Sequence, residues 1–157
     1  MAEIERKFGW WDMFVAPDDD PRTDGGFTGE RDTLVGYLRD QRLTLELKCS
    51  GLDAEQLARR SVEPSTMSLL GLVRHMSEVE RHWFRRELAG QDAAKLYCTG
   101  EDPDGDWNGA VPDVKVADEA WRSWRAEVAF AEQFVGTPPT WARSAPRRCR
   151  CATCWCT

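Results

Sequence analysis

Histidine is scarce in this chain, which has only His75 and His82 among its 157 residues. Both lie in one segment, so imidazole chemistry is restricted to a single part of the molecule. The sequence has no glycine-flanked nucleophile elbow, which leaves Ser/His/Asp catalysis with weak support. It also has no glycine-rich loop of the kind that cradles phosphate. If the protein binds a catalytic metal, the segment with the two histidines is the place to look.

Long apolar runs are also missing, since nothing approaches the roughly 18 apolar residues of a membrane span. The N-terminus, MAEIERKFGWW, contains acidic residues and no small-residue cleavage site, which argues against a secretory signal. The net charge of −6 argues against nucleic acid as the main partner. We therefore expect a cytoplasmic protein that contacts neither membrane nor nucleic acid.

The strongest feature present is an amphipathic segment over residues 66–89, which predicts a long helix. Its apolar positions recur at three- and four-residue spacing, which places them on one stripe. Pro64 and Ser65 precede it and Gly90 follows it, as start and stop signals. The stripe consists of Leu69, Leu72, Met76, Val79 and Trp83, and the two histidines fall on its flank.

Two more helices are predicted, over residues 30–49 and 119–135. Thr28 and Asp118 are the expected N-caps, and Gly51 and Gly136 the expected stops. Asp53 with Gln56 forms a capping-box pattern that starts a short turn between the first two helices. The expected inward residues are Leu34, Leu38 and Leu45 in the first helix and Trp121, Trp124, Val128 and Val135 in the last.

Residues 8–27 begin with aromatics and are predicted to be an extended strap packed on the helices, while residues 91–117 are predicted to be a loop. Four loop acids occupy positions 1, 3, 5 and 12 of a calcium-loop count. Trp107 stands at position 6, where that pattern requires glycine, and position 12 is not glutamate. The loop is therefore interpreted as a solvated acidic turn. Its acids are Asp102, Asp104, Asp106 and Asp113.

The composition changes after Gly136, so residues 1–136 are interpreted as the folded domain and 137–157 as an irregular Pro/Arg/Cys-rich tail. The tail cysteines have the spacing C-x-C-x₂-C-x-C, which could bind zinc or an iron–sulfur cluster. Structural zinc normally uses two pairs separated by a dozen or more residues, so a metallothionein-like or chance pattern is an equal alternative. These cysteines are Cys149, Cys151, Cys154 and Cys156; Cys49 and Cys98 are isolated in the domain, where Cys49 is expected to be a small core residue.

The long helix with its flanking segments, LVGYLRDQRLTLELKCSGLDAEQLARRSVEPS before it and EDPDGDW and AWRSWRAEV after it, resembles the DinB-like superfamily. Within it the chain is most similar to the actinobacterial mini-circle branch, over roughly residues 8–136. The resemblance implies an all-α, up-down-down-up four-helix bundle, often a homodimer. It also implies a divalent metal, Zn or Ni, and transfer or isomerisation chemistry that joins a small-molecule thiol (mycothiol in actinobacteria) to an electrophile.

The same resemblance implies that His75, in LVRHMSEVE, is the metal ligand of the second helix. In the family the remaining ligands come from a fourth helix with a motif such as EEYARHNGH. No histidine follows His82 here, and Pro138, Pro139 and Pro146 lie where that helix is expected. The fourth helix is therefore predicted to be missing or replaced by the tail.

The codons of the tail suggest an origin for it. In the frame two bases later, Cys154–Trp155 must give Leu, Trp155–Cys156 must give Val, and Cys156–Thr157 must give His or Tyr. Leu-Val-His resembles the start of the family's fourth helix. A frameshift near residues 138–139 is our hypothesis, and resequencing of the locus tests it.

Three functions follow as alternatives from this sequence. The first is a metal-dependent thiol transferase, impaired by loss of the fourth helix. The second is a non-catalytic helical or dimerising protein, and the third is a zinc-binding Cys-rich tail.

Overall fold

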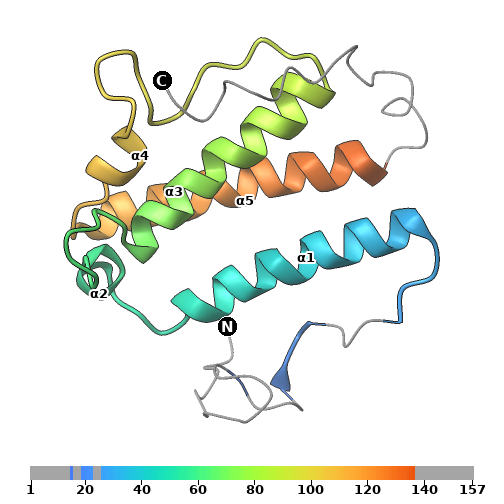
Figure 1. The fold of residues 1–157 in the computed structure, drawn as a ribbon, viewed down its shortest axis with the longest axis horizontal. Helices are drawn as coiled ribbons and strands as arrows, with labels where there is room; N and C mark the ends of the chain where they lie inside the picture. The colour runs from blue at the N-terminus through green and yellow to red at the C-terminus, as the bar shows by residue number, and fades with distance from the viewer. Residues whose placement is uncertain (1–14, 16–18, 23–25, 137–157) are drawn as a thin grey trace. The chain divides into compact units, whose positions relative to one another are not determined.

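The computed structural model describes residues 15, 19–22 and 26–136 (Figure 1). Within this part every regular element is helical, which confirms the all-α prediction. The chain divides into two compact units, Met1–Leu52 and Asp53–Thr157, which we describe one at a time. The four-helix arrangement stays a prediction, and the 137–157 tail and the first aromatics of the strap lie outside the described residues. No helix within the described ranges is long and apolar enough to cross a bilayer.

The first unit contains α1, Glu30–Cys49, which matches the predicted helix. Its N-cap is Gly29 at φ +91°, which has no side-chain cap, so the prediction for Thr28 was wrong. In place of a side-chain cap, acidic side chains in the first turn stabilise the start of the helix by their interaction with the positive end of the helix dipole. Gly51 follows the helix at φ +68°, the left-handed conformation expected of a stop signal.

Packing in this unit differs from the predicted stripe. Leu34 is 63% exposed, so its predicted inward position was wrong, whereas Leu45 is buried as expected. Cys49 is also buried, in line with its predicted core role. Near the start of α1 the ring of Phe27 covers Gly36, where a Cβ would lie 2.2 Å from the ring. Only glycine allows this aromatic ring so close to the helix backbone.

The second unit begins with α2, Ala54–Ala58, whose start is the predicted capping box. The Gln56 amide donates to Asp53 Oδ1 at 2.8 Å, and the Asp53 amide donates to Gln56 Oε1 at 3.0 Å. This pair fills two backbone donors that the helix itself leaves unsatisfied.

The long histidine helix is α3, Leu69–Glu80, and continues as the π-helical segment η2, Arg81–Leu88. It begins three residues later than predicted because Ser68 is its N-cap, accepting the Gly71 amide at 3.0 Å. Gly90 has φ +65° just after it, as a stop signal requires.

The buried face of α3 is offset by about one residue from the predicted apolar stripe. Three of its buried residues are polar, and they have partners: Arg74 and Ser77 hydrogen-bond to backbone carbonyls, and Glu80 also has an interaction. Trp83, the last member of the predicted stripe, is 42% exposed. A count of apolar residues alone therefore misplaced the face. The residues buried in α3 are Leu70, Gly71, Val73, Arg74, Ser77 and Glu80.

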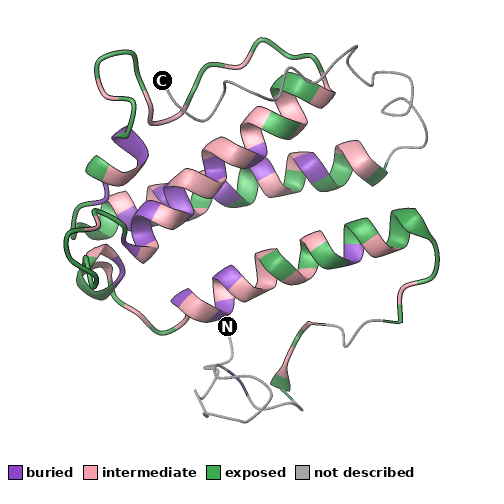
Figure 2. Cartoon of the chain, viewed as in Figure 1, coloured by how far each residue is buried: buried purple, intermediate pink, exposed green. Residues whose placement is uncertain are grey.

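The last helix, α5, spans Val114–Gly136 and starts five residues before the predicted helix. Asp113 rather than Asp118 precedes it and accepts the Lys115 amide at 2.7 Å. The predicted 91–117 loop contains a short helix, α4, Gly105–Asn108. Both α4 and α5 pack against α3 (Figure 1), and Figure 2 shows buried residues on all three. Trp124 of α5 is buried as predicted, whereas Trp121, Val128 and Val135 are half-buried.

An ion-pair cluster joins η2 to α5. The Glu127 carboxylate is buried and accepts from Arg81 Nη1 at 2.7 Å and from Arg85 Nε. The Arg85 guanidinium also lies over the Phe130 ring at 4.0 Å. Two cations from one helix thus neutralise one buried anion from another.

We expect Glu127→Ala to lower the free energy of unfolding by about 3 kcal/mol, because it leaves two partly buried arginines without their shared carboxylate. The exposed Glu87, on the same helical segment as the arginines, is the matched control, and Glu87→Ala should change stability by less than about 0.5 kcal/mol. Urea denaturation followed by circular dichroism measures both. Equal losses in the two variants would contradict a structural role for the cluster.

Candidate metal-ligand site

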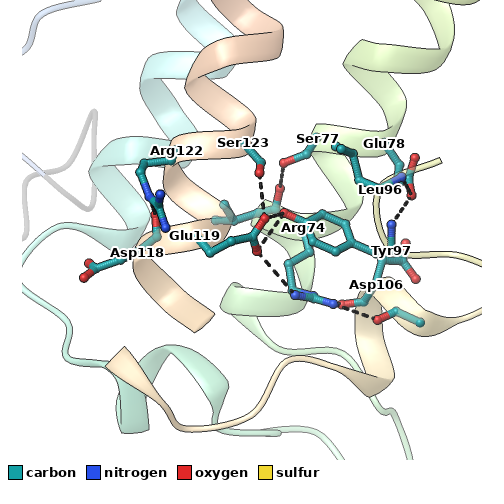
Figure 3. A network of polar contacts seen from close by, with 12 residues as sticks. Arg74, Ser77, Glu78, Leu96, Tyr97, Asp106, Asp118, Glu119, Arg122 and Ser123 are labelled. Carbon is teal, nitrogen blue, oxygen red and sulfur yellow. Dashed lines mark hydrogen bonds and ion pairs between the residues drawn. The ribbon is translucent and has the colours of Figure 1, made fainter. Parts of the chain in front are cut away.

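The candidate site forms where α3 meets the 96–108 segment, and Glu78 holds that segment in place. Glu78 Oε1 accepts the backbone amides of Leu96, Tyr97 and Cys98 at 2.7, 2.6 and 3.2 Å. Figure 3 shows this carboxylate reaching from α3 to the segment. A carboxylate with three amide donors is a strong, charge-assisted anchor.

Arg74 provides a second anchor, to α4. Its buried guanidinium donates from Nε to the Asp106 carbonyl at 2.9 Å and from Nη2 to the Gly105 carbonyl at 3.0 Å. It also lies over the Tyr97 ring at 3.9 Å, with Glu119 3.9 Å from Nη1 (Figure 3). The planar fork of arginine suits this double contact, which fixes the backbone of α4 on α3.

The Asp106 side chain points back to α3 and is only 5% exposed. Its Oδ2 lies 2.7 Å from His75 Nδ1, and its Oδ1 accepts the Trp107 amide at 3.0 Å. Both carboxylate oxygens therefore have a donor. The prediction of a solvated acidic turn was therefore wrong for Asp106, because a buried carboxylate must find such partners, whereas Asp104 and Asp113 are exposed as predicted.

His75 itself is 29% exposed, and one face of its ring is covered by Trp107. The two rings are stacked with centroids 5.1 Å apart and planes 28° apart. Trp107 in turn lies against Gly71, where a Cβ would come within 2.6 Å of the indole. Nδ1 is engaged by Asp106, and Nε2 makes no hydrogen bond to any residue that the structure describes.

The second histidine has different surroundings. His82 lies in η2, with its side chain 39% exposed and Nε2 4.0 Å from Glu87. Its ring meets Trp83 edge-on at 5.2 Å. It has no buried carboxylate partner among the described residues, so the two histidines of one helix differ clearly in their readiness to bind a cation.

A divalent metal at this site would need more ligands than the described residues supply. Within residues 15, 19–22 and 26–136, no three His, Cys, Asp or Glu side chains are grouped to hold a metal ion. Catalytic sites usually have three protein ligands and an open position. His75 could therefore provide one metal ligand, with Asp106 as the carboxylate that supports it, but the described residues do not provide a complete set of ligands.

Burial raises the pKa of the half-buried Cys98 thiol, next to the site. A backbone hydrogen bond from Asp106 acts in the opposite direction, while the negative charges of Asp106 and Glu78 raise the pKa further. Burial likewise raises the pKa of Tyr97, whose hydroxyl lies 3.2 Å from Glu119. Cys98 is thus a protonated thiol near neutral pH rather than a ready nucleophile.

The fold and site define a helical protein in which one histidine of α3 pairs with a buried carboxylate of α4. A family model described as Mycothiol-S-transferase (MST) matches residues 33–154. Because this match covers well over half of the chain, the protein belongs to the mycothiol-S-transferase family, a DinB-like family, which confirms the resemblance seen in the sequence. The match begins later than the expected 8–136 and extends into the tail. No curated protein and no solved structure matches the chain.

The sequence had pointed to His75 but missed the residues around it. Asp106 was assigned to solvent with the other loop acids, and Arg74 was given no role. Trp107 was noted only because it breaks a calcium-loop pattern. The apolar alanine and tryptophan near Asp106, in DGDWNGA, are the one local sign that this acid is not in a solvated turn.

We expect alkylation of Cys98 by iodoacetamide to reach half its maximal rate at a pH above the ordinary cysteine value of about 8.5. Burial favours the neutral thiol, so the thiolate that reacts forms only at higher pH. Peptide mass spectrometry isolates Cys98 from the other cysteines, and the denatured chain is the control. A midpoint equal to that of the denatured chain would contradict the raised pKa.

Proposed function

We propose that this chain is an impaired mycothiol S-transferase in which His75 binds a divalent metal through Nε2. The observation that carries the proposal is the contact of 2.7 Å between His75 Nδ1 and the buried Asp106 carboxylate. Histidines that bind metals commonly donate their other ring N–H to a carboxylate. The family match supports a small-molecule thiol as substrate.

The roles of the neighbouring residues follow from their contacts. Asp106 orients the imidazole, and Trp107 covers one ring face against water. Arg74 keeps Asp106 in reach by holding its backbone. A bound divalent cation would supply Lewis acidity, which favours a thiol in its thiolate form. Zinc and nickel both accept imidazole nitrogen as a ligand.

We also propose that metal capture, and with it transfer activity, is impaired in this chain. One imidazole alone gives a dissociation constant on the order of millimolar, since it contributes only a fraction of the free energy of a three-ligand site. A replaced fourth helix would account for the shortage. The homodimer implied by the family resemblance belongs to the same proposal.

Titration with Zn²⁺ or Ni²⁺, followed by calorimetry, tests the ligand role. We expect weak binding to the full chain that is lost in His75→Ala and unchanged in the matched control His82→Ala. The reason is that His75 has a buried carboxylate partner at 2.7 Å, whereas the carboxylate near His82 is exposed and 4.0 Å away. A variant with serine at the four tail cysteines separates binding by the tail from binding by His75.

Each outcome decides between the alternatives. Metal that is lost only with the four cysteines would favour a zinc-binding tail and reject the His75 site. Metal bound by none of the proteins would favour a non-catalytic helical protein.

In a mycothiol-conjugation assay with added metal, we expect no turnover above the uncatalysed reaction, since the described ligand set is incomplete. Product formation is followed by chromatography, with enzyme-free buffer as the control. Robust turnover that His75→Ala abolishes would refute the impairment and retain His75 as a ligand.

A further inference from the structure

We infer that Asp106 is the positioning residue for His75: its carboxylate fixes the imidazole in the tautomer that carries hydrogen on Nδ1 and leaves the Nε2 lone pair free. This inference rests on the proposed role of His75 as a ligand through Nε2. It concerns a residue that the family resemblance did not assign and that comes from a different element, α4, rather than from the histidine helix.

The chemistry of the contact sets the tautomer. A carboxylate accepts hydrogen bonds and cannot donate one when ionised. At 2.7 Å from Asp106 Oδ2, Nδ1 of His75 must therefore supply the hydrogen. In neutral imidazole the other nitrogen, Nε2, then has the lone pair that a metal needs.

The carboxylate cannot easily turn away from this arrangement. Its second oxygen, Oδ1, accepts the Trp107 amide at 3.0 Å, so a rotation about the side chain would break two hydrogen bonds. The side chain is also 5% exposed, which leaves little water to replace them. The orientation of Asp106 is thus fixed from both oxygens.

The backbone under Asp106 is fixed as well, by the residue next to His75. Arg74 donates to the carbonyls of Gly105 and Asp106 at 3.0 and 2.9 Å, as Figure 3 shows for Asp106. A Cβ on Gly109 would lie 2.5 Å from the same guanidinium, so the turn after α4 also closes around it. Consecutive residues of α3 therefore hold the main chain and the side chain of one aspartate.

Ring stacking completes the orientation. The indole of Trp107 lies 5.1 Å from the imidazole and nearly parallel to it, and it occupies the space that Gly71 leaves open. The hydrogen bond fixes one edge of the imidazole and the indole fixes one face. Only the Nε2 edge remains available for a ligand.

Asp106→Asn is the sharpest test, because it keeps the shape of the side chain and removes one acceptor. The Trp107 amide, which also donates to the Asp104 carbonyl at 2.9 Å, can only donate a hydrogen bond, whereas Nδ1 of a neutral imidazole can donate or accept. An NH₂ group facing the amide would place two donors against each other, so the asparagine oxygen should remain there and the NH₂ group should face His75 Nδ1. Nδ1 must then accept, and the hydrogen moves to Nε2. We expect the tautomer to invert, with the Nε2 lone pair lost.

The measurement is ¹⁵N NMR of the imidazole nitrogens in the metal-free full chain at alkaline pH. Wild type should show hydrogen on Nδ1, and Asp106→Asn should show it on Nε2. The control is Asp104→Asn, an exposed acid two residues away that makes no side-chain cap bond, and it should match wild type. Affinity for Zn²⁺ should fall about 10- to 100-fold in Asp106→Asn and stay constant in the control.

The outcomes separate this inference from the proposed function. Hydrogen on Nε2 in wild type, or no change of tautomer in Asp106→Asn, would overturn the positioning role even if His75→Ala still loses metal. If His75→Ala binds metal as wild type does, the ligand role fails whatever the tautomer. Should Asp106→Asn lose its helical circular dichroism, Asp106→Glu decides: it retains an acceptor, and a wild-type tautomer there with unchanged affinity supports the inference, whereas hydrogen on Nε2 overturns it.

Discussion

The second unit depends on a single buried cation, the guanidinium of Arg74. Its two hydrogen bonds to carbonyls of α4 join this helix to α3. With only four residues, α4 could not be stable alone. Because it also lies over Tyr97 and near Glu119 of α5, one side chain of α3 contacts α4, the segment before it and α5. Together with Glu78, which accepts three backbone amides of the preceding segment, these contacts hold Asp106 beside the histidine helix.

Apolar periodicity predicted the existence of the main helices and, for α1, the bounds, because spacing and stop signals are local properties. It misplaced the buried face of α3, since Arg74, Ser77 and Glu80 are buried through polar contacts that an apolar count ignores. Starts were wrong where two capping residues competed, as with Ser68 over Ser65 and Asp113 over Asp118. These choices depend on tertiary packing, which a single sequence does not display.

The site shows the same division between local and long-range information. His75 came from the family resemblance, and its partner Asp106 is 31 residues away. Trp107, which excludes a calcium loop because it replaces the required glycine, is the residue that stacks on His75. The residue that breaks the calcium-loop pattern therefore has a different role in the same segment, and this role becomes visible only in the fold.

The polar groups around His75 have hydrogen-bond partners within the protein, without a metal. Asp106 has donors at both oxygens, and Arg74 has carbonyl acceptors, so no buried charge in this set requires a cation to balance it. The contacts that hold α4 on α3 therefore do not require a cation at His75, unlike those of small zinc domains that unfold when the metal is removed. Loss of part of the proposed ligand set would leave the contacts among α3, α4 and α5 unchanged, and the imidazole of His75 would keep the orientation that Asp106 and Trp107 give it.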